Sequence, residues 1–144
     1  MRTETSRFKD YIETKRLYFT PERQCVAEEV FSNHKHLDAE ELLKILKTKG
    51  SKASRATVYR TLDLLVESGL VDKIDLGDGR AVYEHIAGHT HHDHLICVKC
   101  GSVEEFEEPL IEQLQDWACE KAGFKATGHN LNIYGYCRSC NATQ

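Results

Sequence analysis

The fold of this 144-residue chain is decided by residues 54–84, which read SRATVYRTLDLLVESGLVDKIDLGDGRAVYE. The first part predicts a helix that ends at Gly69, because Val58, Leu62 and Leu65 recur at helical spacing and form one apolar face. The second part predicts two short strands joined by a Gly-Asp-Gly turn, which is typical of a hairpin. Helices followed by such a hairpin are the order of a winged-helix domain, a variant of the helix-turn-helix.

The residues before this segment predict three further helices. The first runs from Ser6 to about Lys15. A second begins at Thr20-Pro21, which combines an N-cap side chain with proline at the first helical position. A third begins at Asp38, which is followed three residues later by Glu41 as in a capping box, and ends at Gly50.

Polar residues on the first turns of the helix at 54–68 point away from its apolar face. They are candidates for DNA contacts, because the last helix of a winged-helix domain enters the major groove. Residues 1–84 carry no excess positive charge, since 15 Lys and Arg balance 15 Asp and Glu. Binding to DNA phosphates would therefore need clustered cations, and an ordinary solvated surface is the alternative. The candidate DNA contacts are Ser54, Arg55, Thr57, Tyr59, Arg60, Arg23, Lys15 and Arg16.

The second half of the chain has a different chemistry. Residues 85–144 hold five of the six cysteines, six of the eight histidines and the whole net charge of −4. This change predicts two domains, one at 1–85 with the winged-helix pattern and one at 90–144 with the candidate metal ligands, with a hinge about 84–90. No apolar run approaches the roughly 20 residues of a membrane span, and the polar start MRTETSRFKD lacks a signal-peptide core. We expect a cytoplasmic protein with reduced thiols and no membrane association.

Two CxxC pairs stand 36 residues apart, at Cys97/Cys100 and Cys137/Cys140. Each pair can direct two thiolates at one ion, and together they predict a tetrahedral structural zinc site. A redox dithiol is the alternative, but neither pair has the strand-to-helix setting of thioredoxin. Cys25 and Cys119 lie within helical patterns and are expected to be buried as small apolar residues.

The segment His89-Thr90-His91-His92-Asp93-His94 is the second candidate metal site. On a strand, alternate residues share a face, so His92 and His94 would serve one ion and His91 and Asp93 another. Each ion would need further ligands from elsewhere in the chain. The segment also contains HxHxDH, the zinc signature of metallo-β-lactamase hydrolases, which is a remote alternative because that fold is a far larger αββα sandwich.

The remaining residues predict a β-β-α-β unit around these ligands. A strand is expected at Ser102–Glu108, a helix from Pro109 that carries Leu110, Leu114 and Trp117, and a strand at Lys125–Tyr136. Such a small unit has little core and exposed strand edges, which zinc and pairing with a second copy would compensate. A homodimer would also suit a palindromic DNA site.

These residues resemble the ferric uptake regulator family of bacterial metal-dependent repressors over nearly the whole chain. The resemblance is strongest at 54–62 (SRATVYRTL) and 91–101 (HHDHLICVKCG), with support from 36–42 (HLDAEEL), Tyr83-Glu84 and 128–131 (GHNL). It implies an α+β fold, with an N-terminal winged-helix DNA-binding domain and a small C-terminal α/β dimerisation domain. It also implies palindromic, AT-rich double-stranded operator DNA, and homodimers that can pair into tetramers.

The resemblance implies a role for each metal-ligand cluster. The structural zinc ligands are Cys97, Cys100, Cys137 and Cys140. The regulatory site, which joins the two domains, comprises His36, Glu84, His92, His94 and Glu105. A third site within the dimerisation domain comprises His91, Asp93, Glu112 and His129. Three other histidines, His34, His85 and His89, fall outside the family pattern and are expected at the surface.

The implied function is repression that depends on a regulatory divalent metal, without enzymatic activity. The metal is expected to be Fe²⁺, although Zn²⁺, Mn²⁺ or Co²⁺ can occupy such ligands in vitro. Family members that sense peroxide typically have Asp at the positions of Glu84 and Glu105, which favours control of iron uptake here. Regulation of zinc uptake, manganese uptake or peroxide stress remains the alternative within the family.

Overall fold

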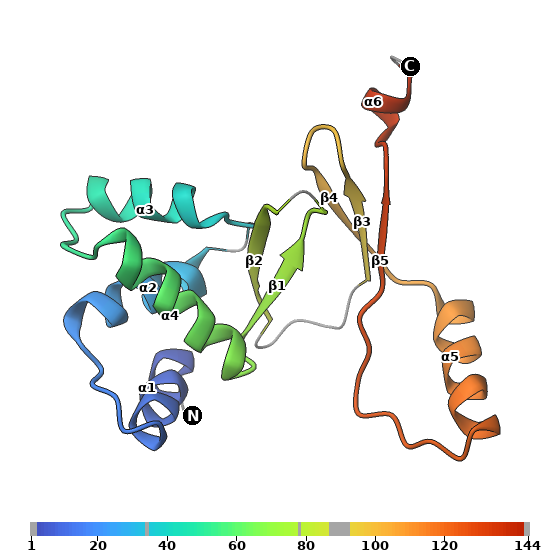
Figure 1. The fold of residues 1–144 in the computed structure, drawn as a ribbon, viewed down its shortest axis with the longest axis horizontal. Coiled ribbons are helices and arrows are strands. Elements are labelled where there is room, and N and C mark those ends of the chain that lie inside the picture. Colours follow the sequence, from blue (N-terminus) through green and yellow to red (C-terminus); the bar gives the residue numbers. More distant parts are fainter. Residues whose placement is uncertain (1–2, 34, 78, 87–92, 143–144) are drawn as a thin grey trace. The chain divides into compact units, whose positions relative to one another are not determined.

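The computed structural model describes residues 3–33, 35–77, 79–86 and 93–142, in two compact units at residues 1–90 and 91–144 (Figure 1). The described residues of the N-terminal unit form helices first and then a hairpin. The elements are α1 (Glu4–Thr14), α2 (Pro21–Ser32), α3 (Ala39–Thr48), α4 (Arg55–Glu67), β1 (Val71–Asp75) and β2 (Ala81–His85). The two strands are antiparallel, with Val71 opposite His85 and Asp75 opposite Ala81. This is the winged-helix order that the sequence predicted.

Side-chain N-caps determine where three of these helices begin, and two of them, at Thr20 and Asp38, were predicted. Thr20 Oγ1 accepts the backbone N–H of Arg23 at 3.2 Å, Asp38 Oδ1 accepts that of Glu41 at 2.7 Å, and Ser54 Oγ accepts that of Thr57 at 3.2 Å. Each bond satisfies a backbone donor that has no partner within its helix. The Asp38 and Ser54 caps therefore fix the starts of α3 and α4.

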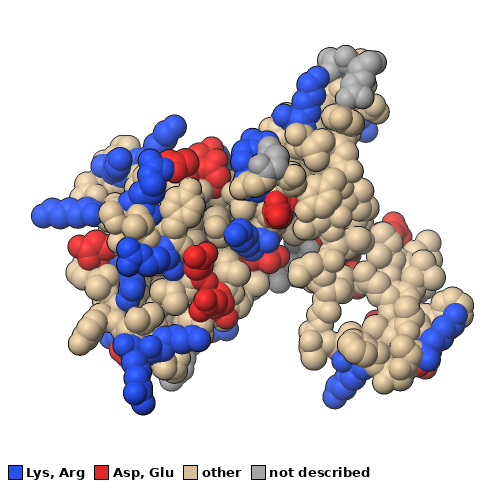
Figure 2. All heavy atoms as spheres, in the orientation of Figure 1, with Lys and Arg blue, Asp and Glu red and all other residues tan. Residues whose placement is uncertain are grey.

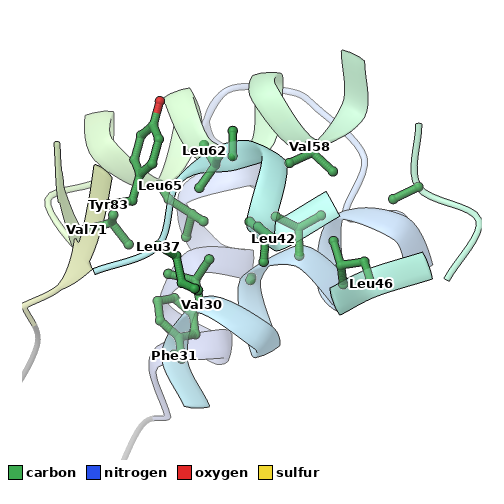
Figure 3. Close-up of a cluster of buried hydrophobic side chains, with 14 of the residues drawn as sticks. Val30, Phe31, Leu37, Leu42, Leu46, Val58, Leu62, Leu65, Val71 and Tyr83 are labelled. Atoms are coloured by element: carbon green, nitrogen blue, oxygen red, sulfur yellow. The ribbon is translucent and has the colours of Figure 1, made fainter. Parts of the chain in front are cut away.

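The hydrophobic core of the N-terminal unit lies between α4 and the other helices. Val58, Leu62 and Leu65 are fully buried on the inner face of α4, as predicted. Figure 3 shows them facing Leu42 of α3 and Val30 of α2, with other core side chains around them. Since this face of α4 is occupied by the core, its opposite face is free for recognition.

The C-terminal unit is built on a three-stranded sheet. Its elements are β3 (Asp93–Cys97), β4 (Val103–Phe106), α5 (Pro109–Lys121), β5 (Asn132–Gly135) and α6 (Arg138–Asn141). The strand order is β4-β3-β5, with β3 antiparallel to β4 and parallel to β5. The central strand β3 therefore carries Asp93 and His94, the last two residues of the metal-ligand segment, between two neighbouring strands.

Both outer strands of this sheet are shorter than the sequence predicted. The expected strand at 102–108 is limited to Val103–Phe106, and the one at 125–136 to Asn132–Gly135. The central strand β3 limits the length of both outer strands. It has five residues, and it pairs with β5 only from His94 to Cys97. The helical turn α6, which places the second CxxC pair, was not predicted.

Three burial predictions are wrong. Cys25 is exposed, because the inner face of α2 is taken by Val26 and its helical neighbours. Cys119 is half-buried, on a helix, α5, that buries none of its side chains within the described chain. His85, expected at the surface, is buried on β2. Its Nε2 lies 2.7 Å from Glu4 Oε2. The positions of His34 and His89 lie outside the described residues.

The C-terminal unit buries few apolar side chains within the described chain. Ile96 and Cys97 are buried on β3, whereas Leu110, Leu114 and Trp117 of α5 are each more than half exposed. The apolar stripe of α5 is therefore available to a partner. Across the described residues, no helix has both the length and the apolar character that crossing a membrane requires.

Candidate metal centres and nucleic-acid interface

Four cysteines of the C-terminal unit converge on one point. Cys97 ends β3, Cys100 closes the following turn, Cys137 is the N-cap of α6 and Cys140 lies within α6. Their sulfur atoms lie within 4.8 Å of one another, and Cys100 Sγ is 3.8 Å from Cys137 Sγ. Four sulfur ligands so close together fit tetrahedral Zn²⁺ of the structural type.

Backbone N–H groups favour the ionised form of two of these thiols. Hydrogen bonds from the backbones of Cys100 and Cys137 lower the pKa of the Cys97 thiol to about 5. The Cys140 backbone lowers the pKa of the Cys137 thiol in the same way. The pKa of Cys140 is raised to about 12, first by its hydrogen bond with the Cys137 thiol. Because zinc binds thiolates, these backbone donors favour the metal-binding form of Cys97 and Cys137.

A second ligand cluster lies on one face of β3. His129 Nε2 is 3.5 Å from Asp93 Oδ1 and 3.3 Å from Glu112 Oε1. Asp93 is buried on β3, Glu112 lies in the first turn of α5, and His129 precedes β5. Three different elements thus supply an imidazole and two carboxylates, a set that suits a divalent first-row metal. The fourth predicted member, His91, lies outside the described residues.

The next residue of β3, His94, belongs to the opposite face of the strand. His94 is buried and pairs directly across the sheet with Glu105 of β4, so this face also offers an imidazole beside a carboxylate. The adjacent residues Asp93 and His94 therefore lie beside different candidate ligands, Asp93 beside His129 and His94 beside Glu105. His92 lies outside the described residues.

The N-terminal unit contains another imidazole–carboxylate pair. His36 Nε2 lies 3.6 Å from Glu84 Oε2. The pair follows from an isolated bridge in which Leu37 and Tyr83 exchange backbone hydrogen bonds of 3.1 and 2.7 Å. This bridge attaches the segment before α3 to β2 and brings His36 beside Glu84.

Four of the predicted DNA contacts line one cavity of about 410 Å³ in the N-terminal unit. They are Arg16, Arg23, Thr57 and Arg60. Arg23 is oriented by a hydrogen bond of 2.6 Å from its Nη1 to the carbonyl oxygen of Tyr18. Three arginines and one acidic residue, Glu22, line this hollow, so its net positive charge suits an anion such as a DNA phosphate. Figure 2 shows further Lys and Arg side chains over the visible face of this unit, interspersed with carboxylates.

The other predicted DNA contacts have different surroundings. Arg55 forms an ion pair with Glu40 of α3, and the Tyr59 hydroxyl donates to the same Glu40 oxygen at 3.2 Å. Lys15 lies over the Tyr11 ring, with Nζ 5.6 Å from the ring centroid. Ser54 is occupied as the cap of α4. Sequence reasoning missed Glu40, which no motif singled out because its partners lie 15 and 19 residues away.

A winged-helix unit followed by a unit rich in thiolate and imidazole ligands defines a metal-binding regulator of transcription. Comparison with known proteins narrows this class. A family model described as the ferric uptake regulator family matches residues 14–134. The Ferric uptake regulation protein of Legionella pneumophila is 48% identical over 109 residues, which cover 76% of this chain and 79% of that protein.

Solved structures agree with this relationship. The ferric uptake regulator from Francisella tularensis, solved with iron, has a TM-score of 0.76 at 36% identity and covers 87% of this chain and 95% of that one. The regulator from Helicobacter pylori, whose structure is described as revealing three functional metal binding sites, has a TM-score of 0.81 at 28% identity. The match covers 94% of this chain and 89% of that one. The chain belongs to the ferric uptake regulator family.

Family membership confirms the predicted fold class and the predicted role. The protein is a metal-dependent transcriptional regulator with a winged-helix DNA-binding domain and a dimerisation domain, and regulators of this family bind operator DNA as dimers. Membership of a family of transcriptional regulators favours regulation over the zinc-hydrolase interpretation of HxHxDH, and Asp93 and His94, the two described residues of that motif, lie on β3 of a small three-stranded sheet.

Proposed function

We propose that the protein is an Fe²⁺-dependent repressor of iron-uptake genes, acting in the cytoplasm without enzymatic activity. The observation that carries this proposal is a repeated pairing of imidazole and carboxylate, as His36 with Glu84 and as His94 with Glu105. Nitrogen and oxygen ligands of this kind suit Fe²⁺ and other first-row divalent ions. His92 completes the proposed regulatory set of five ligands, as the family resemblance implies.

The proposed control is thermodynamic linkage. The five ligands come from the DNA-binding domain, its hinge and the dimerisation domain, so one ion that engages them all favours a particular domain arrangement. A metal that binds the DNA-competent arrangement more tightly shifts the population toward it by its difference in affinity. Metal-loaded protein would then bind its operator and block transcription, and metal-free protein would release it.

The proposed DNA interface comprises the exposed side of α4 and the cavity beside it. Arg16, Arg23 and Arg60 would neutralise phosphates, while Tyr59 would contact a base edge or methyl group in the major groove. A palindromic, AT-rich operator would be bound by a homodimer, and paired dimers would make the tetramer. The dimerisation domain would hold a structural Zn²⁺ on its four cysteines and a third metal on His91, Asp93, Glu112 and His129.

Control of zinc uptake, manganese uptake or peroxide stress is the second candidate. The carboxylates favour iron-uptake control over peroxide sensing, because Glu84 and Glu105 stand where peroxide sensors of the family typically carry Asp. Affinity alone does not separate iron from the later ions, which bind N and O ligands more tightly in the Irving–Williams order.

The deciding experiment measures operator binding by gel shift against buffered Fe²⁺, Mn²⁺, Co²⁺ and Zn²⁺, with metal analysis of the purified protein. We expect tight binding with Fe²⁺ under anaerobic conditions and none after chelation of the regulatory ion. His94→Ala and Glu105→Ala should abolish the metal response while retaining the four-cysteine zinc. Glu104→Gln is the matched control, since Glu104 lies on the same strand opposite Leu95. Operator binding that needs no divalent ion, or a normal response in both variants, would contradict the proposal.

A further inference from the structure

A single carboxylate, that of Glu40, holds two side chains of the proposed DNA-reading surface. Glu40 lies at the start of α3, where it forms an ion pair with Arg55 and accepts a hydrogen bond of 3.2 Å from the Tyr59 hydroxyl. Arg55 and Tyr59 stand four residues apart on α4, so both face the same side of that helix. All three groups are exposed rather than buried in the core.

The exposure of this cluster argues against a role in folding. The Arg55 and Glu40 side chains are 60% and 48% exposed, and ion pairs in such positions contribute little to stability. A carboxylate on a DNA-binding surface also repels phosphates. The effect of Glu40 on its two partners is therefore best sought in DNA binding rather than in folding.

The chemistry of the contact suggests what that reason is. The Tyr59 hydroxyl is a donor at neutral pH because the ordinary pKa of a tyrosine is about 10, and partial burial and the hydrogen bond to Glu40 raise that pKa further. Because the hydrogen bond to Glu40 restricts the Tyr59 side chain, that side chain loses less conformational entropy when it binds a base. With its charge partly offset by Glu40, Arg55 attracts a phosphate less strongly than an unpaired cation would.

We propose that Glu40 is a positioning residue that sets the specificity of DNA recognition. It orients Tyr59 for one base contact. It also weakens the attraction of Arg55 for phosphates, which are the same in every DNA sequence. The inference rests on the proposed function, since it requires α4 to be the recognition helix. Glu40 acts through its two partners and touches no base itself.

Two substitutions separate the two roles. Glu40→Gln keeps an oxygen acceptor for Tyr59 but removes the charge that pairs with Arg55. The freed Arg55 should reach a phosphate, so affinity should rise for operator and random DNA alike, and the salt slope should steepen by about 0.9 per protomer. Glu40→Ala also frees Tyr59, so the ratio of operator to random affinity should fall about three- to tenfold, the cost of ordering one side chain.

The experiment measures anisotropy of labelled duplexes at several salt concentrations, with the full-length dimer saturated with Mn²⁺. One duplex is selected by the wild-type protein from a randomised library, and the other is of random sequence. Glu41→Gln is the charge-matched control, because it removes an exposed carboxylate from the same turn of α3. Repeating Glu40→Ala in a Tyr59→Phe background tests the coupling between Glu40 and the Tyr59 hydroxyl. In that background we expect no further fall in the ratio of operator to random affinity.

Each outcome has a defined meaning. An unchanged ratio in Glu40→Ala, or a Glu41→Gln slope as steep as that of Glu40→Gln, would overturn the role of Glu40. A loss of ratio that persists in the Tyr59→Phe background would overturn the proposed route through Tyr59. If the wild-type protein bound operator and random DNA equally, the proposed function would fall together with this inference. If Arg60→Ala weakened binding while the Glu40 variants behaved as wild type, only the inference would fall.

Discussion

Arg16 occupies a backbone conformation that ordinarily belongs to glycine. Its φ of 58° is left-handed, at the position where α1 ends. The backbone N–H of Leu17 donates to the Ile12 carbonyl at 3.1 Å and that of Arg16 to the Glu13 carbonyl at 3.0 Å, which forms a Schellman motif. A side chain there costs about 1–2 kcal/mol relative to glycine. The guanidinium that this position contributes to the cavity beside α4 offers a reason to retain Arg16.

Replacing Arg16 by glycine should make the protein more stable but weaken its binding to DNA. Arg16→Gly should raise the free energy of unfolding by about 1 kcal/mol, because glycine adopts the left-handed conformation without strain. The same variant should bind operator more weakly, with a salt slope smaller by about 0.9 per protomer if one phosphate contact is lost. Chemical denaturation and anisotropy titrations measure the two effects. A variant that gained stability and kept full affinity would exclude Arg16 from the interface.

Arg60 lines the same cavity from α4 and allows a second prediction. If it reads a base, Arg60→Ala should cost about 1–3 kcal/mol per half-site and relax specificity at one position. If it meets only a phosphate, affinity should fall evenly across sequences and the salt slope should drop by about one unit per contact. Affinity against salt, measured on operator and random duplexes, separates these cases. Undiminished affinity at every salt concentration would remove Arg60 from the interface.

At the scale of elements, the start of α4 decides how the recognition surface is presented. Ser54 was predicted to contact DNA, and its hydroxyl caps this helix through the backbone N–H of Thr57. The cap sets the first two turns, from which Arg55, Thr57 and Tyr59 project.

The cap can be tested apart from DNA contact. Ser54→Ala should destabilise the protein by about 1 kcal/mol, since a backbone donor at the start of α4 loses its partner. Ser54→Asp should restore stability, because aspartate caps equally well, yet it should bind DNA less tightly because of its charge. Thermal unfolding followed by circular dichroism gives the first effect and gel shift the second. Equal stability of the Ala variant and the wild type would contradict the assigned cap.

At the scale of the whole molecule, the two units depend on different sources of stability. The N-terminal unit has a core drawn from four helices and the hairpin, whereas the C-terminal unit buries Ile96 and Cys97 but leaves the apolar residues of α5 exposed. So small a core needs additional constraints, which the four-cysteine metal site and the dimer interface would supply.

Loss of one cysteine should therefore unfold one unit and spare the other. Cys97→Ser leaves three thiolates, and we expect it to lose zinc and dimerisation while the N-terminal unit stays helical. Zinc analysis, sedimentation and circular dichroism measure these properties. Cys25→Ser is the matched control, because Cys25 is exposed on α2 and lies apart from the four-cysteine site. A zinc-free Cys97→Ser protein that remained a folded dimer would refute the role of this site.

The sequence by itself determined the features that depend on neighbours along the chain. The caps at Thr20 and Asp38, the buried face of α4 and the hairpin were predicted because their interactions span at most a few residues. The opposite faces of Asp93 and His94 follow equally from the alternation of a strand. Each CxxC pair could also be predicted from the local sequence, since both of its thiols belong to one turn.

Only the tertiary structure decided which distant groups meet. Glu40 with Arg55 and Tyr59, Glu4 with buried His85, and the length of β5 all depend on how separate elements pack. Periodicity shows which side of a helix or strand is apolar, but it carries no information about the partner that will cover that side. Contacts between elements are selected by the joint packing of the core, and for that reason the carboxylate at the recognition surface was visible only in the folded chain.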